Sequence, residues 1–298
     1  MSLTSLRYFN EVVRAGSIRE AADRLHIAPS ALSRQMRNLE VTFGLPLFER
    51  HARGVVPTSA GELYARYARA ALLDEERINS EIDDLKGLRR GHVRICSVEG
   101  VVANGLTHAI ATFRKRFQGV SISLEITGTE SVITAVRNGD ADIGVAFTSS
   151  PEADIQRTMR LKDPLFAIMI AGYPAAKQRR LSFSDTLQYP VAVPRKHFGI
   201  RTLLDTRCRT AQVTLNPTLE TNSIEALRGF ARSGCGITYL PRLTVKREIE
   251  AGQVVAVPLT DRELQQATVD VCVLKGRTLP TATAGFLNHL HATLPTLR

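Results

Sequence analysis

The sequence predicts an α/β protein in two parts, a helical N-terminal region and a larger region of alternating strands and helices. Three observations lead to this prediction. Apolar residues recur at helical spacing through the first ninety residues, a long helical pattern follows residue 59, and strand and helix patterns alternate after residue 91. Two α/β lobes joined by two chain crossings would enclose a cleft, and ligands bind at such boundaries.

The N-terminal region opens with three predicted helices. They run from Leu3 to a turn at Gly16, from Ile18 to Leu25, and from Pro29 to about Thr42. Pro29 suits the first turn of a helix, but Ala28 before it offers no side-chain cap, a contact usually worth about 1 kcal/mol. The third helix should bury Leu32, Met36 and Leu39. Two short helices joined by a tight turn, with a polar face on the second, form a helix-turn-helix pattern.

A strand pair and a long helix are predicted next. Residues 47–57 suggest two short strands about a glycine turn, and Ser59 with Glu62 forms a capping-box signature. The helix that it opens should reach about Leu88, a length of about 45 Å. Such a long helix with an apolar side suggests a pairing surface. The apolar positions are Leu63, Tyr67, Leu72, Leu73, Ile78, Ile82 and Leu85.

The remaining chain predicts a parallel α/β sheet in each of two lobes. The expected strands are 93–98, 122–126, 141–147 and 268–274, and the expected helices are 101–117, 131–138 and 281–294. A similar unit spans about 165–259, with crossings near 147–165 and 258–268. We therefore expect a helix-turn-helix domain at 1–58, a linker helix at 59–90 and a ligand domain at 91–298. Its lobes would be about 91–163 with 267–298, and about 164–266.

Composition narrows the function classes. The 298 residues carry 39 Lys and Arg against 29 Asp and Glu, and most of this excess follows residue 90, so net charge is not the argument for DNA binding. The longest apolar stretch, Phe166–Ala176, is too short to span a membrane, and we expect no signal peptide and a cytoplasmic protein. Four widely spaced cysteines predict free thiols in place of disulfides or a zinc site.

Several motifs together resemble LysR-type transcriptional regulators. They are Gly16–Glu40, Phe43–Arg50, Thr58–Gly61, Asn138–Gly144 and Gly234–Pro241. The resemblance implies a winged helix-turn-helix, a dimerising linker helix and a two-lobed effector domain like that of periplasmic solute-binding proteins. It implies a homotetramer, as a dimer of dimers, acting on double-stranded promoter DNA in a bacterial cytoplasm. The resemblance also allows RNA polymerase as a partner, and it implies no cofactor other than a small-molecule effector.

The candidate DNA contacts lie on the third helix and beside the glycine turn. They are Pro29, Ser30, Ser33, Arg34, Gln35, Arg50 and Arg53. Arginine can bond guanine bidentately and glutamine can bond adenine, at about 1–3 kcal/mol of discrimination each. Serine can reach a phosphate or a base, and an arginine of the wing can enter a narrow minor groove. The alternative is a solvated polar helix face and a solvated loop charge.

The candidate effector contacts follow strands or open helices. They are Ser97, Val98, Thr129, Glu130, Phe147, His197, Phe198, Arg201 and Asn222. Hydroxyls and free N–H groups at helix starts, with the basic cluster Arg195, Lys196 and Arg201, predict a small anionic effector, by preference a carboxylate. The alternative is that these cations are solvated. Glu99 and Glu130 could instead repel an acid or bond an amine.

No catalytic or metal-binding motif was found, so we expect no enzyme and no metal site. Two other functions remain open. The first is a thiol redox sensor that uses Cys208 and Cys235, although only Arg207 and Arg209 could lower a thiol pKa there. The second is a solute-binding module without DNA binding, against which the ninety-residue N-terminal region argues.

Overall fold

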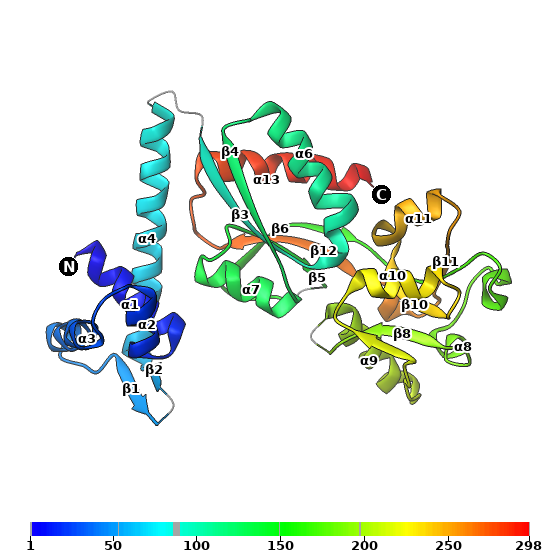
Figure 1. Cartoon of the computed structure of the whole chain (residues 1–298), viewed down its shortest axis with the longest axis horizontal. Helices are drawn as coiled ribbons and strands as arrows, with labels where there is room; N and C mark the ends of the chain where they lie inside the picture. Colours follow the sequence, from blue (N-terminus) through cyan, green and yellow to red (C-terminus); the bar gives the residue numbers. More distant parts are fainter. Residues whose placement is uncertain (1, 53, 86–89, 149, 197, 298) are drawn as a thin grey trace. The chain divides into compact units, whose positions relative to one another are not determined.

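The computed structural model describes residues 2–52, 54–85, 90–148, 150–196 and 198–297. The chain divides into two compact units, residues 1–86 and 87–298 (Figure 1). No described helix is both long and apolar enough to cross a membrane.

The first unit contains four helices and a two-stranded antiparallel sheet. They are α1 (Leu3–Ala15), α2 (Ile18–Arg24), α3 (Pro29–Phe43), β1 (Phe48–His51), β2 (Gly54–Pro57) and α4 (Ser59–Leu85). The hydroxyls of Ser2 and Ser17 accept the N–H groups of Ser5 and Glu20 and so cap α1 and α2. Ala28 leaves α3 without a side-chain cap, as predicted.

An aromatic cluster joins these elements into one core. The ring of Phe9 in α1 lies 4.8 Å from that of Phe48 in β1 and 4.6 Å, edge-on, from that of Tyr64 in α4. The inner face of α3 packs on the same core through Leu32, Met36 and Leu39. Strands β1 and β2 and helices α3 and α4 therefore share one hydrophobic cluster and form a single body.

The start of α4 corrects one expectation. The cap is Thr58 and not Ser59: the Thr58 hydroxyl accepts the N–H of Gly61 at 3.0 Å and donates to the carbonyl of Pro46 at 2.7 Å. A Cβ on Gly61 would lie 2.0 Å from the Leu47 carbonyl oxygen, so only glycine permits this approach. The helix is thus fastened at its first turn to the segment that leads into β1.

The second unit contains two five-stranded sheets. The first, in the order β4-β3-β5-β12-β6, has β3 (Gly91–Ser97), β4 (Val120–Ile126), β5 (Ile143–Phe147), β6 (Ile155–Lys162) and β12 (Thr268–Leu274). The second, in the order β11-β7-β10-β8-β9, has β7 (Leu165–Met169), β8 (Val191–Pro194), β9 (Leu219–Thr221), β10 (Ile237–Pro241) and β11 (Val255–Pro258).

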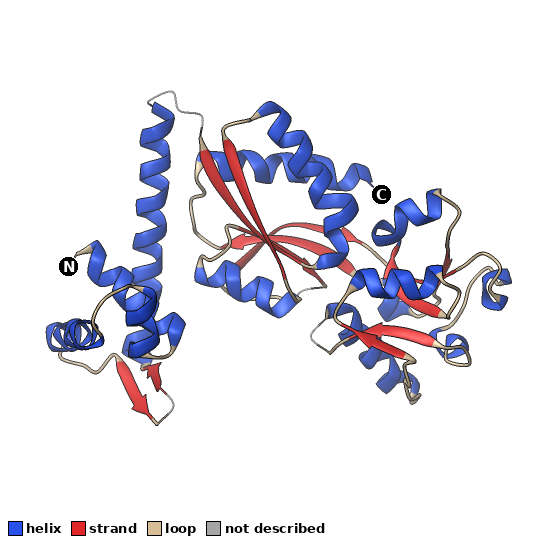
Figure 2. Cartoon of the chain, in the orientation of Figure 1, coloured by secondary structure: helices blue, strands red, loops and turns tan. Residues whose placement is uncertain are grey.

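Helices cover these sheets and connect their strands. Figure 2 shows α6 and α13 on one side of the first sheet and α7 on the other. The first lobe has α5 (Glu99–Val101), the π-helical η1 (Val102–Leu106), α6 (Thr107–Arg116), α7 (Thr129–Asn138), α13 (Thr281–Thr293) and η4 (Leu294–Leu297). The rest are η2 (Pro174–Lys177), α8 (Phe183–Thr186), α9 (Gly199–Ala211), α10 (Ile224–Arg232), η3 (Arg242–Val245), α11 (Lys246–Glu250) and α12 (Arg262–Gln265).

The sheets are mixed, which corrects the expectation of parallel ones. β12 is antiparallel to both β5 and β6, and β7 is antiparallel to both β10 and β11. The segment 147–165, expected to be a crossing between the lobes, contains β6. The helix expected at 101–117 is interrupted by η1.

The chain crosses between the two sheets twice. It leaves the first sheet through residues 163–164 and returns through residues 259–267, which include α12. The N–H of Asp163 donates to the carbonyl of Ala267 at 2.8 Å, so the two crossings lie side by side. They are the covalent connections between the lobes.

A buried aspartate ties together the central strands of the first sheet. The Asp142 carboxylate accepts the Arg94 backbone N–H at 2.9 Å and the Arg94 guanidinium at 2.9 Å, and Arg277 lies 2.9 Å away. Burial alone would raise the pKa of Asp142, but the hydrogen bonds and charge of Arg94 and the charge of Arg277 outweigh it and lower this pKa. Asp142 therefore stabilises the fold in its charged form.

We predict that Asp142→Asn removes an acid-dependent part of the stability of the second unit. Because the folded pKa is lowered, this stability is complete above the ordinary value of 3.8 and is lost as pH falls through the folded pKa. Urea unfolding followed by far-UV circular dichroism should show a wild-type advantage at neutral pH that shrinks on acidification. The control, Glu125→Gln, removes an exposed charge on β4 of the same unit and should leave this pH dependence unchanged. A wild-type advantage that does not change with pH would contradict the assignment.

We also predict that Gly54→Ala loosens the hairpin of β1 and β2, which we call the wing. Gly54 has φ +139°, a Cβ there would lie 2.2 Å from the Gly16 carbonyl oxygen, and that carbonyl accepts the Val55 N–H at 2.8 Å. Such strain costs about 1–3 kcal/mol, so hydrogen exchange at the Val55 amide should accelerate about tenfold or more. Gly44→Ala is the control, because Gly44 also has a positive φ but faces open space. Equal acceleration by both variants would refute the steric explanation.

Candidate nucleic-acid interface and ligand cleft

The outward face of α3 carries most of the predicted nucleic-acid contacts. Pro29, Ser30 and Arg34 are exposed, while Ser33 and Gln35 are half-buried. Arg34 has no ion-pair partner among the described residues, and no acidic residue lies in the first turn of α3. The face therefore offers a guanidinium, an amide and two hydroxyls to an external partner.

The two-stranded wing is held against α3 by a carboxylate. Oε1 of Glu40 accepts the backbone N–H groups of Leu47 and Phe48 at 2.9 and 3.2 Å. Arg50 is exposed on β1, and Arg53 lies outside the described residues. A helix face and a neighbouring hairpin, held at a fixed spacing, suit the adjacent grooves of a double-stranded nucleic acid.

Four of the predicted effector contacts meet in a cleft between the two sheets of the second unit. Val98, Thr129 and Phe147 line it from the first lobe, and Phe198 lines it from the second. The cleft is nearly closed, with a cavity volume of about 20 Å³, which is room for about one water molecule. A ligand of metabolite size therefore requires the lobes to separate.

The other predicted effector contacts do not line this cleft. Ser97 is buried, and its hydroxyl donates to the Val98 carbonyl at 3.0 Å. Asn222 is exposed, and Glu130 borders an adjoining hollow that shares Thr129 and Phe147 with the cleft and includes Lys196. His197 lies outside the described residues.

Arg201 is engaged within the second lobe. Its guanidinium contacts Asp205 at 2.8 Å and Glu220 at 2.7 Å, and donates to the Pro194 carbonyl at 3.1 Å. Only 9% of the side chain is exposed. The sequence pattern identified a cation here, but not the two carboxylates that neutralise it.

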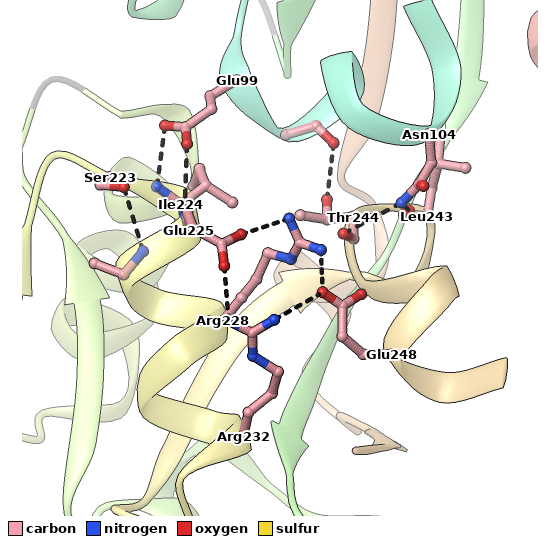
Figure 3. Close-up of polar contacts among 12 residues, drawn as sticks. Glu99, Asn104, Ser223, Ile224, Glu225, Arg228, Arg232, Leu243, Thr244 and Glu248 are labelled. Carbon is pink, nitrogen blue, oxygen red and sulfur yellow. Dashed lines mark hydrogen bonds and ion pairs between the residues drawn. The ribbon is translucent and has the colours of Figure 1, made fainter. Parts of the chain in front are cut away.

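Glu99, which was not among the expected effector contacts, clasps the two lobes together. Its carboxylate extends from α5 to the first turn of α10 and accepts the N–H groups of Ile224 at 3.0 Å and Glu225 at 3.3 Å (Figure 3). A helix N-terminus attracts negative charge, so the protein places its own anion where the sequence predicted a ligand anion. Ser223 caps α10, and a serine at such a helix start is the sequence signal that could have identified this contact.

Further hydrogen bonds that involve η3 also cross between the lobes. The amide of Asn104 donates to the Leu243 carbonyl at 2.9 Å, and the hydroxyl of Thr244 donates to the Gly100 carbonyl at 3.1 Å (Figure 3). Asn104 belongs to η1, so the π-helical turn presents its side chain at the contact between lobes.

The charges that line the cleft do not match an anionic ligand. Among the described lining residues, Glu99 and Asp163 are charged, and none is lysine or arginine. The rest of the lining is mainly apolar. The cation cluster on which the anion expectation depended lies elsewhere.

Three of the four cysteines, Cys96, Cys208 and Cys272, offer little thiolate. All four are free, burial raises the pKa of Cys96 to about 11 and that of Cys272 to about 12, and burial also raises the pKa of Cys208. No group of three or more His, Cys, Asp or Glu side chains in the described ranges is placed to hold a metal ion.

Comparison with known families matched both parts of the chain. Residues 3–62 match the model described as "Bacterial regulatory helix-turn-helix protein, lysR family", and residues 86–295 match the "LysR substrate binding domain".

Individual relatives match nearly the whole length. A RuBisCO operon transcriptional regulator of Allochromatium vinosum is 27% identical over 257 residues, which cover 86% of this chain and 85% of the relative. The HTH-type transcriptional regulator CbbR of Rhizobium meliloti (strain 1021) is 28% identical over 270 residues, covering 89% and 85%. Full-length OxyR from Pseudomonas aeruginosa shares the fold, with a TM-score of 0.72, 20% identity and 98% and 95% coverage.

We predict that Glu99→Ala loosens the contact between the lobes. Loss of a carboxylate from a partly exposed helix start costs about 1 kcal/mol, so the Ile224 and Glu225 amides should exchange hydrogen about fivefold faster. Glu125→Ala, at an exposed position on β4 of the same lobe, is the charge-matched control. Unchanged exchange at both amides in Glu99→Ala would show that the clasp contributes nothing in solution.

Proposed function

The chain belongs to the LysR family of bacterial transcriptional regulators, and we propose that α3 reads its operator directly. It is a DNA-binding regulator whose activity an effector modulates. The observation that supports direct reading is the exposed face of α3, where Arg34 has no ion-pair partner among the described residues. In this proposal Arg34 and Gln35 bond base edges in the major groove, while Ser30 and Ser33 position the helix on phosphates.

The wing supplies the second part of the proposed interface. Arg50 projects from β1, and Glu40 fixes the start of that strand relative to α3. An arginine beside a recognition helix can enter the neighbouring minor groove, where the negative potential rises as the groove narrows. Arg53 remains a proposed contact from the sequence alone.

Self-association through α4 is also proposed. Leu63, Tyr67, Ile78 and Ile82 are 61%, 53%, 44% and 44% exposed, and each pair is spaced by four residues along one helix. Exposed apolar side chains at this spacing favour a second copy of the helix. A dimer through α4, and a tetramer built from two dimers, would present α3 to a partly palindromic operator.

The effector is proposed to act in the cleft between the two sheets. Glu99, Asn104 and Thr244 hold the lobes together across it, and the cavity is too small for a metabolite in this state. An effector that separates the lobes would shift a conformational equilibrium and so alter the DNA-binding parts. Because promoters are the proposed target, we place this action in the cytoplasm.

Selective retention of genomic DNA tests this function. Purified protein is incubated with fragmented genomic DNA at moderate salt, and the retained fragments are sequenced. Discrete sites with partial palindromes support specific operator binding. Diffuse retention that disappears as salt rises would reduce the interaction to backbone electrostatics and overturn the proposal.

We predict that Arg34→Ala abolishes most operator discrimination. Loss of a bidentate base contact costs about 1–3 kcal/mol, so the ratio of operator to random-DNA affinity should fall by about 10- to 100-fold in a competition assay. Arg66→Ala removes the same charge from an exposed position on α4 and should leave this ratio unchanged. Unaltered selectivity in Arg34→Ala would remove Arg34 from the reading face.

A further inference from the structure

A large hollow lies beside the two chain crossings, outside the effector cleft. This hinge pocket is bordered by Lys162 at the end of β6 and by Asp163 and Pro164 of the first crossing. Arg262 and Gln266 border it from the second crossing, and η3 and α11 complete the lining. Its cavity volume is about 770 Å³, within the range of small-molecule sites, while that of the cleft is about 20 Å³. The larger space for a ligand is therefore at the hinge.

Cationic side chains surround the hinge pocket. Lys162, Arg242, Lys246 and Arg262 line it from four different elements, against the two carboxylates of Asp163 and Glu250. Lys162, Arg242 and Arg262 are exposed and have no ion-pair partner among the described residues. Lys162, Arg242 and Arg262 therefore converge from separate elements and create a positive potential that favours an anion.

The remaining lining is suited to an apolar body. Pro164, Phe166, Leu243 and Ile249 contribute hydrophobic surface next to the cations. A site of this composition would bury a hydrocarbon or aromatic portion and orient its charged group by arginine. An inorganic anion would contact the cations of the pocket but not its apolar side chains.

The pocket is connected to the contact between the lobes through η3. Arg242 and Leu243 line the hinge pocket, whereas Thr244, the next residue, lines the cleft. The Leu243 carbonyl and the Thr244 hydroxyl make the two cross-lobe bonds to Asn104 and Gly100. A ligand that moves η3 or either crossing therefore alters the same bonds that an effector in the cleft must break.

We propose that the hinge pocket is a second effector site, which binds a small organic acid with an apolar body. The acid group, a carboxylate or a phosphate ester, pairs with Arg242 and Arg262, and the body packs on Phe166 and Ile249. We infer binding of the acid from the pocket alone. Its regulatory effect rests on the proposed function, because it requires an operator whose affinity can change.

Calorimetry of the full-length protein tests the site with named probes. The acids are benzoate, hexanoate and phenyl phosphate, and the comparison compounds are benzamide and inorganic phosphate, each at millimolar concentration in excess chloride. We expect the acids with apolar bodies to bind, benzamide not to bind, and inorganic phosphate to bind more weakly. Because each lost charge-assisted bond is worth about a factor of ten, Arg242→Gln with Arg262→Gln should weaken acid binding about 100-fold.

The control is Arg179→Gln with Arg180→Gln, which removes two exposed cations of the same lobe that do not line the hinge pocket. Equal weakening by this pair would mean that the acids bind through net charge and would overturn the proposal. So would equal binding of benzamide, or failure of every acid to bind. Acid binding by a protein that retains no specific DNA would instead support the pocket while refuting the proposed function.

Discussion

The second unit is organised by the requirement that its chain cross between two sheets and return. The outgoing segment at 163–164 and the returning segment at 259–267 lie side by side through the bond from Asp163 to Ala267. The returning chain enters the first sheet as β12 between β5 and β6, antiparallel to both. The cleft and the hinge pocket both include Asp163 of the outgoing segment, and any relative motion of the lobes has to pass through the two segments.

The distribution of charge around this junction is uneven, and it separates two kinds of ligand. The cleft has the carboxylates of Glu99 and Asp163 and no lysine or arginine among its described lining residues, while the hinge pocket has four cations. The N-terminus of α10, the natural anion site of the cleft, is already satisfied by Glu99. An acid would therefore have to displace an internal carboxylate to bind in the cleft, whereas at the hinge it meets cations directly. A neutral or cationic effector suits the cleft better than the acid that the sequence predicted.

Sequence patterns predicted most elements because apolar periodicity reflects burial directly, and the positions of α1, α3, β12 and α13 follow it closely. They missed β6 because its residues Ile155–Lys162 carry arginines, and the partner of Arg160, Asp270, lies on a strand far away in the sequence. The cap of α4 was misplaced by one residue, because Thr58 and Ser59 are equally good caps until the Pro46 carbonyl selects between them. Arg201 and Glu99 illustrate the same limit at the site: residue type predicts a charge, but only the fold shows which partner already holds it. The base contacts of α3 stay predictions.

The fastening of α4 to the wing has a mechanical consequence. Thr58, Gly61 and the shared aromatic core make the reading helix, the wing and the 27 residues of α4 one rigid lever. A lever of about 40 Å that tilts by about five degrees at its far end moves its near end by about 3.5 Å, close to the rise of one base pair. If α4 pairs two copies as proposed, the angle at which α4 is held would set the spacing of the two α3 helices. A change too small to disturb any packed core would then be enough to put these helices out of register with the DNA.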